Sequence, residues 1–135
     1  MIPGFDDLGC LPPGVHQASL DEIDARFGTQ SELRRVQMES VRWMVDLAAR
    51  ADVQRIVLNG SFVTDIIEPN DVDCVLLLAG GVKRDRSAVA ELEQGLPFLD
   101  IALVRGVAFE EFIQRVFAAD RSGAPKGMIE VVQWN

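Results

Sequence analysis

The carboxylates Asp71 and Asp73 stand two residues apart at the start of the segment 71–78, DVDCVLLL. The apolar residues that follow predict a strand, and residues two apart on a strand project from the same face. Neighbouring carboxylates repel each other, and each raises the pKa of the other unless a cation lies between them. A hard, oxygen-seeking ion such as Mg²⁺ or Mn²⁺ suits such a pair. The spacing therefore predicts a divalent-metal site; the alternative is that Asp71 and Asp73 are only turn residues, since residues 68–71 have the composition of a turn.

A third carboxylate, Asp100, lies inside a second apolar segment, 98–104, FLDIALV. An unpaired carboxylate buried in a strand is costly, so this residue needs a reason for its position. If the strand at 98–104 lies beside the strand at 72–78, Asp100 joins Asp71 and Asp73 in one cluster. Three carboxylates can bind one or two divalent cations and orient a hydroxyl for attack on phosphate, with Asp100 as the base for that hydroxyl. The alternative is an edge-strand residue that faces water.

A short strand is predicted at 55–60 and ends at Asn59-Gly60, and Ser61 follows it. A glycine directly after a strand lets the backbone approach a ligand closely. Ser61 offers a hydroxyl and a main-chain N–H, and a helical turn after it would direct further N–H groups at a phosphate. Metal-held carboxylates opposite such a phosphate cradle form a geometry for phosphoryl transfer.

The order strand, Gly-Ser, nine residues, Asp-hydrophobic-Asp, and an Asp on a later strand resembles the signature of the nucleotidyltransferase fold shared with DNA polymerase beta. The resemblance implies a mixed sheet flanked by helices and transfer of a nucleotidyl group from an NTP to a hydroxyl. It also implies residue roles: Gly60 and Ser61 hold the nucleotide, and Asp71, Asp73 and Asp100 are the catalytic, metal-binding carboxylates. The core resemblance covers about residues 53–105. The ends, 11–28 and 120–131, are similar to a family of small, uncharacterised nucleotidyltransferase-like bacterial proteins.

One departure from this pattern concerns charge. Many minimal nucleotidyltransferases carry basic residues just after Gly-Ser, which suits a triphosphate, whereas this chain has FVTD at 62–65 and Glu68 further on. The extra acids oppose phosphate, so positive charge must come from elsewhere. The candidates are Lys126, retained as a nucleotide-binding residue, Arg121, and the cluster Lys83, Arg84 and Arg86. For 121–127 the alternative is a plain surface turn.

Two functions fit these residues. The first is a minimal Mg²⁺-dependent nucleotidyltransferase that uses an NTP and a small-molecule or protein hydroxyl as the acceptor. By the same resemblance, some minimal members act as antitoxins that modify a partner toxin. The second is a catalytically silent module of the same fold, whose acidic loop at 62–71 engages a protein partner.

The elements that position these residues follow from capping and periodicity. Ser19 opens a capping box with Glu22, and Gly28 ends that helix. Thr29 or Ser31 caps a longer helix, whose apolar positions recur at three- and four-residue steps. The expected helices are 20–27, 31–51, 85–94 and 108–119, and the expected strands are 55–60, 72–78 and 98–104, with 128–134 as a last strand or a docked tail.

Packing expectations follow from the same patterns. The buried face of the long helix is expected to comprise Leu33, Val36, Val41, Met44, Val45, Leu47 and Ala48. Arg34 is assigned to the solvated side of that helix. The proline-rich segment 1–18 is expected to be irregular, with His16 in a surface or capping role. The alternation of elements is typical of an α/β or α+β protein with a small sheet.

Composition limits the classes of function. The 135 residues are 48% hydrophobic, which fits one domain spanning 1–135. Because 13 Lys and Arg face 21 Asp and Glu, the formal charge is −8, and binding to nucleic acid in general or to anionic membrane surfaces is disfavoured. Cys10 and Cys74 cannot form a disulfide framework, and the longest apolar stretch, 75–79, is too short to span a membrane. With an N-terminus unlike a signal peptide, these features predict a cytoplasmic protein.

Overall fold

A five-stranded mixed sheet forms the centre of the computed structural model, which describes residues 2–80, 85–117 and 126–134. The strands are β1 (Gly14–Ala18), β2 (Val53–Asn59), β3 (Val72–Leu78), β4 (Leu99–Arg105) and β5 (Gly127–Val131), in the spatial order β1-β5-β2-β3-β4. The pairs β1–β5 and β3–β4 are parallel, and β2 is antiparallel to both of its neighbours. This arrangement confirms the expected α/β class with a small mixed sheet.

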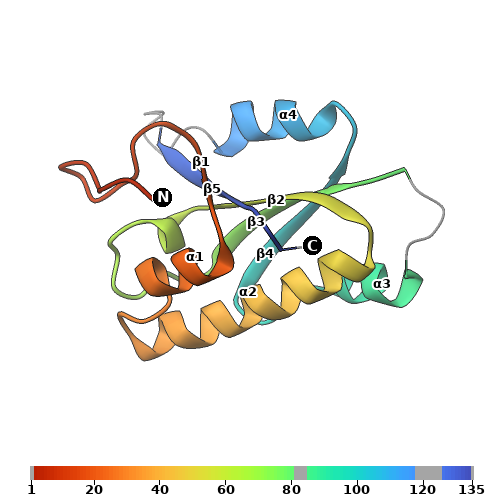
Figure 1. Ribbon diagram of the computed structural model, residues 1–135, viewed down its shortest axis with the longest axis horizontal. Helices are drawn as coiled ribbons and strands as arrows, with labels where there is room; N and C mark the ends of the chain where they lie inside the picture. The colour runs from red at the N-terminus through yellow and green to blue at the C-terminus, as the bar shows by residue number, and fades with distance from the viewer. Residues whose placement is uncertain (1, 81–84, 118–125, 135) are drawn as a thin grey trace.

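Helices cover both faces of the sheet (Figure 1). On one face lie α1 (Leu20–Phe27), α2 (Glu32–Arg50) and α3 (Arg86–Gln94), over the larger apolar cluster. On the other face lies α4 (Ala108–Phe112), which continues as a π-helical turn, Ile113–Phe117. A smaller cluster beneath α4 comprises Val57, Val75, Phe109, Ile113 and Met128.

The helix starts follow from side-chain caps. Ser19 and Glu22 form the expected capping box, and Gly28 ends α1 with its N–H on the Asp24 carbonyl. Ser31, rather than Thr29, caps α2, because its hydroxyl accepts the Arg34 N–H at 3.1 Å.

Two expected segments differ from the structure. The segment 1–18 is not irregular throughout, because Gly14–Ala18 forms β1 against β5. This short edge strand has no apolar run of its own, and a partner far away in the sequence sets its register. His16 lies within β1, and its Nε2 is 2.7 Å from the carbonyl oxygen of Pro12 in the segment before that strand. The expected helix 108–119 is divided into α4 and the π-helical turn, and residues 118–119 lie outside the described residues.

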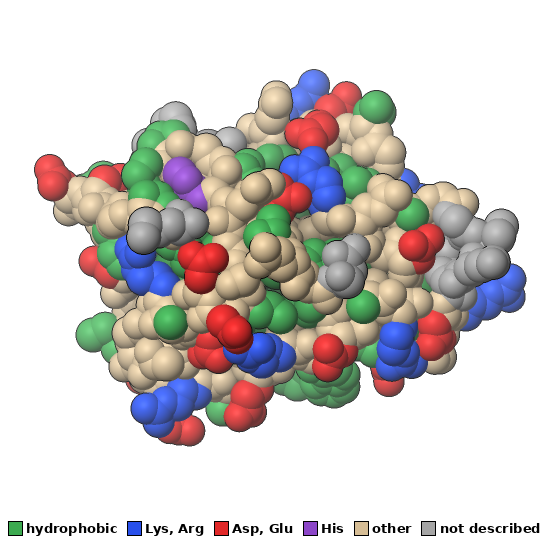
Figure 2. All heavy atoms as spheres, in the orientation of Figure 1, with side chains coloured by type: hydrophobic (Ala, Val, Ile, Leu, Met, Phe, Trp, Pro, Cys, Tyr) green, Lys and Arg blue, Asp and Glu red, His purple; other side chains and the backbone are tan. Residues whose placement is uncertain are grey.

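The surface carries both signs of charge. On the face shown in Figure 2, the basic side chains of the described residues are scattered among acidic ones and do not join into a continuous basic surface. Within the described part of the chain, no helix is both long and apolar enough to cross a membrane.

Candidate functional site

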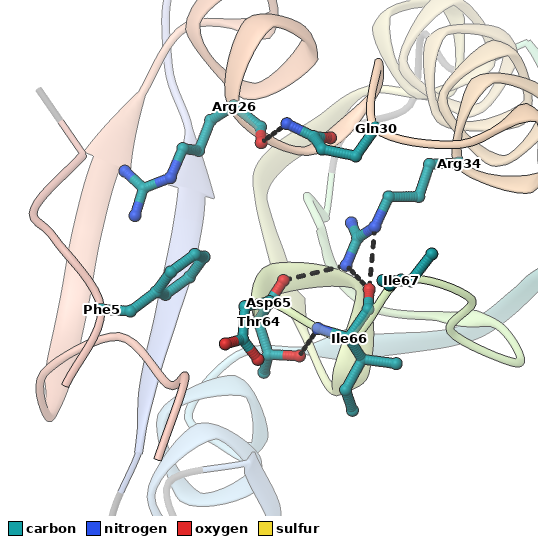
Figure 3. Close-up of a pocket in the computed structure, with 8 residues that line it drawn as sticks. All are labelled: Phe5, Arg26, Gln30, Arg34, Thr64, Asp65, Ile66 and Ile67. Carbon is teal, nitrogen blue, oxygen red and sulfur yellow. Dashed lines mark hydrogen bonds between the residues drawn. The ribbon is translucent and has the colours of Figure 1, made fainter. Parts of the chain in front are cut away.

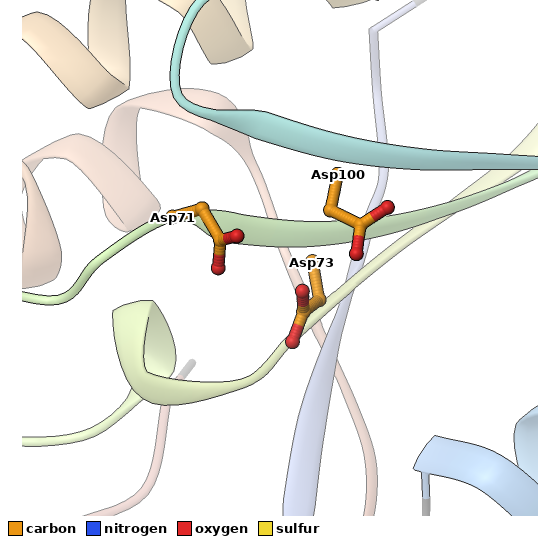
Figure 4. Close-up of side chains that lie close together, drawn as sticks. All are labelled: Asp71, Asp73 and Asp100. Atoms are coloured by element: carbon orange, nitrogen blue, oxygen red, sulfur yellow. The ribbon is translucent and has the colours of Figure 1, made fainter.

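Two neighbouring strands bring the three candidate carboxylates together (Figure 4). The parallel register of β3 and β4 places Asp73 opposite Asp100, and Asp71 stands two residues before Asp73. One carboxylate oxygen from each residue lies within 4.8 Å of the others. Because Val72 and Cys74 point into the larger core, alternation along β3 directs Asp73 to the face that α4 covers. The expected grouping of the three residues is therefore present, and their chemical roles stay predictions.

The geometry of the three carboxylates fits a small divalent cation. Mg²⁺ takes oxygen ligands at about 2.0–2.1 Å in an octahedron, so two ligand oxygens lie at most ~4.2 Å apart. The observed limit of 4.8 Å needs only a small inward movement, which a cation would favour by removing the repulsion. Asp71 and Asp100 are exposed and Asp73 is half-buried, so such an ion could keep the water or phosphate ligands that Mg²⁺ prefers.

Burial and like charge act together on Asp73. The pKa of Asp73 is raised to about 6; desolvation is the largest cause, and the carboxylates of Asp71 and Asp100 act in the same direction. The positive charge of Lys126 opposes these effects and lowers the pKa. A bound cation would therefore stabilise the ionised form of Asp73.

Lys126 stands directly before β5, at the end of the sheet where the triad lies. Its charge acts on Asp73, so this basic residue from the sequence analysis lies near the carboxylates. The other basic candidates are placed differently. Arg86 is exposed at the start of α3, on the opposite face of the sheet, and Arg121, Lys83 and Arg84 lie outside the described residues.

Gly60 lies directly against the triad. Its φ is 81°, a conformation that favours glycine, and a Cβ there would lie 2.3 Å from Oδ2 of Asp73. The next residue, Ser61, begins the 3₁₀ turn η1 (Ser61–Val63), which supplies the helical turn expected after Gly-Ser. The backbone at Gly60 therefore approaches the carboxylate more closely than any residue with a side chain would allow.

A known protein family shares the sequence pattern of this chain over most of its length. A family model described as a family of unknown function, DUF6932, matches residues 3–132. The chain belongs to the DUF6932 family. No curated protein and no solved structure matches it. The match spans Gly60, Ser61, the three carboxylates and Lys126, so the candidate site of this DUF6932 protein lies within the family's own segment.

Sequence reasoning missed the buried polar residues of α2 that contact the loop between Gly60 and β3. The structure buries Arg34, Gln37 and Met38 on the first two turns of α2, whereas Leu33 and Val36 are only partly buried. Arg34 is therefore not on the solvated side: it is 2% exposed. The signal that could have identified it is spacing, because positions 34, 37, 38 and 41 form one helical row. A pattern based on hydropathy alone detects this row only from Met38 onward, because Arg34 and Gln37 are polar.

We expect the affinity of this DUF6932 protein for divalent metals to decrease as the pH is lowered through the range in which Asp73 titrates. A metal ion must displace the proton of Asp73, whose pKa is about 6, so binding is pH-independent above about pH 7. Below pH 6 the Mn²⁺ dissociation constant should rise by about tenfold per pH unit. Calorimetric titration with Mn²⁺ from pH 5 to 8 measures this, and an affinity that stays constant from pH 7 to 5 contradicts it.

We expect the Gly60→Ala variant to weaken Mn²⁺ binding by about tenfold or more. The added Cβ would lie 2.3 Å from Asp73 Oδ2, so the carboxylate must move. With ψ at −162°, the positive φ lies in a region almost exclusive to glycine, so alanine adds backbone strain of about 1–3 kcal/mol. The matched control is Gly80→Ala, since a Cβ at Gly80 meets nothing within 4 Å. Equal Mn²⁺ affinity in a folded Gly60→Ala variant would show that the close approach has no role in the site.

Proposed function

We propose that this protein is a minimal Mg²⁺-dependent nucleotidyltransferase that moves a nucleotidyl group from an NTP to a small-molecule or protein hydroxyl. The observation that carries the proposal is the meeting of Asp71, Asp73 and Asp100 within 4.8 Å, with Gly60 against Asp73. In this scheme Asp71 and Asp73 hold the metal, and Asp100 completes its shell or takes the proton of the attacking hydroxyl.

The proposed step is a displacement at the α-phosphorus of the NTP. The acceptor oxygen forms a bond to that phosphorus, the bond to the leaving pyrophosphate breaks, and the acceptor proton passes to a base. The bound cation would supply charge neutralisation for the phosphates. Ser61 follows the glycine whose backbone lies against Asp73, and the charge of Lys126 acts on the same carboxylate; this proximity supports a role for both in binding the phosphates.

The mixed sheet flanked by helices agrees with what the resemblance to the nucleotidyltransferase fold implies. An antitoxin-like role, in which the acceptor is a partner protein, belongs to this proposal through that resemblance alone.

A second candidate function is a non-catalytic module that binds a protein partner. The observation that favours it is the loop between η1 and β3, where Ile66 and Ile67 are 48% and 69% exposed beside the exposed acids Asp65 and Glu68. Exposed apolar residues within an acidic loop suit a protein surface of basic and apolar character.

Calorimetry distinguishes the two functions. The wild-type protein should bind at least one of ATP, GTP, CTP and UTP in the presence of Mg²⁺, and not after chelation of the metal. Asp71→Ala and Asp73→Ala should abolish that binding, because each removes a metal ligand of the proposed site. Asp46→Ala, at an exposed position on α2, is the control and should bind as the wild type does. A folded wild-type protein that binds no NTP at millimolar concentration contradicts the enzyme proposal and leaves the binding module.

A further inference from the structure

Three polar side chains of α2 and its cap bind the loop that joins the Gly-Ser turn to β3. Ser31, Arg34 and Gln37 are spaced by three residues, so they share one side of the helix. Together they donate hydrogen bonds to the main-chain carbonyls of Ser61, Phe62, Thr64, Ile66, Ile67 and Pro69. The side chains of α2 and its cap therefore hold the loop 61–69, which runs from the proposed phosphate cradle toward the carboxylates, by its carbonyl oxygens.

Arg34 makes most of these contacts. Its Nη1 donates to Phe62 O at 2.7 Å and to Phe27 O at 3.0 Å, and its Nη2 donates to Thr64 O at 2.9 Å and to Ser61 O at 3.5 Å. Its Nε and Nη2 both donate to the Ile66 carbonyl. All three guanidinium nitrogens are therefore occupied by backbone oxygens.

A hollow of about 200 Å³ opens beside this guanidinium, between Phe5, Arg26 and the loop (Figure 3). Figure 3 shows Arg34 directed at the carbonyls of Thr64 and Ile66. Because the nitrogens of Arg34 are already bound to the backbone, Arg34 serves the loop and not a ligand in the hollow.

The charge of Arg34 is also unusual for its surroundings. The side chain is 2% exposed, its guanidinium carbon lies 5.2 Å from the centre of the Phe62 ring, and it forms no ion pair with any described residue. Burial lowers the pKa of Arg34 and the nearby Asp65 raises it, but a guanidinium stays protonated at neutral pH. A buried positive charge thus lies beneath the loop whose own sequence lacks one.

We propose that Arg34 is a positioning residue for the nucleotide phosphates, an inference that rests on the proposed function. Carbonyl oxygens carry partial negative charge and repel phosphate, so a loop that binds phosphate must turn them away. Arg34 draws the carbonyls of Phe62 and Thr64 to the α2 side. It shares the Ser61 carbonyl with Thr64, whose Oγ1 and N–H donate to that oxygen at 2.7 and 3.2 Å. Since the C=O and N–H of a trans peptide point in opposite directions, the N–H of Phe62 faces away from α2.

The choice of arginine follows from the number of bonds. A guanidinium offers five N–H groups in a planar fork, whereas a lysine ammonium offers three on a flexible stem. Lysine at this position would keep the charge but not the simultaneous contact with five carbonyls.

The test separates metal binding from nucleotide binding in Arg34→Met, Arg34→Lys and the wild type. The control is Arg35→Met, since Arg35 is the exposed neighbour on the same helix. Mn²⁺ alone should bind all four proteins within about twofold, because Asp73 and Asp100 lie on β3 and β4 and Asp71 directly precedes β3. With Mg²⁺ present, NTP affinity should fall at least about tenfold in Arg34→Met, severalfold in Arg34→Lys, and not in Arg35→Met.

Each outcome bears on a defined claim. Unchanged NTP affinity in a folded Arg34 variant overturns the positioning role and leaves the proposed function standing. Mn²⁺ affinity that falls in step with NTP affinity also overturns it, because Arg34 would then support the whole site rather than its phosphate end. If Arg34→Met does not fold, Arg34→Lys carries the test. Absence of NTP binding by the wild type overturns the proposed function and this inference together.

Discussion

The Asp73→Asn variant should be more stable than the wild-type protein when no divalent metal is present, although it removes the central carboxylate of the site. The pKa of Asp73 is raised to about 6, so the folded state holds its proton more tightly than the unfolded chain does. The ionised carboxylate therefore destabilises the fold above about pH 6, and this penalty is relieved as the pH falls toward the ordinary value of 3.8. Asparagine removes the charge at every pH.

We expect a gain of about 1 kcal/mol in the free energy of unfolding at pH 7.5, reduced from a larger buried value because Asp73 is partly exposed. In thermal unfolding this corresponds to a rise of about 2–4 °C in Tm. Mg²⁺ at millimolar concentration should raise the Tm of the wild type and leave that of Asp73→Asn unchanged. Asp46→Asn, an exposed position on α2, is the control for charge removal in general. A lower Tm for metal-free Asp73→Asn contradicts the prediction.

The Phe62→Ala variant should lose about 3–5 kcal/mol of stability. Phe62 is 0% exposed, and its ring centre lies 6.0 Å from that of Phe27 in a tilted arrangement. Truncation to alanine leaves a cavity in the larger apolar cluster, where the Phe62 ring packs, and removes the ring that faces Arg34. Urea unfolding measures the loss, and Phe98→Ala, at a position 43% exposed, should lose less than about 1 kcal/mol. Equal losses in the two variants would show that Phe62 has no special place in the core.

The burial of Phe62 also explains why no basic residue follows Gly60 and Ser61. The position directly after Ser61 is a core position, since Phe62 packs into the larger apolar cluster. A lysine or arginine there would bury an unpaired charge. The positive charge that the loop lacks is present on Arg34, which reaches the same turn from α2.

The pairing of Asp71 with Asp73 could be predicted from the sequence because it needs only local strand geometry, whereas the place of Asp100 depended on which strands are neighbours. Asp71 and Asp73 lie on one face for any strand, and Asp100 joins them once β4 lies beside β3. Gly60 and Ser61 were likewise marked by their place directly after a strand. The family assignment adds the limits of the matched segment, 3–132, and no activity.

The contacts of Arg34 could not be predicted, because a single arginine on an amphipathic helix is normally solvated. Its burial depends on carbonyl groups about thirty residues away, whose direction only the folded loop defines. The strand β1 was missed for a related reason: its five residues, GVHQA, alternate weakly, and pairing with β5 imposes their conformation. Long-range pairing of this kind leaves little trace in local composition.

The position of β5 has a consequence for synthesis on the ribosome. β5 is the last strand of the sheet to be translated, yet it lies between β1 and β2. A nascent chain that has emerged only as far as β4 can pair β2, β3 and β4, whereas β1 waits for its partner. The acidic cluster is therefore assembled before Lys126 emerges, so the carboxylates first meet without the positive charge that lowers the pKa of Asp73. If the three carboxylates bind a divalent cation as proposed, that cation would also favour folding at this stage.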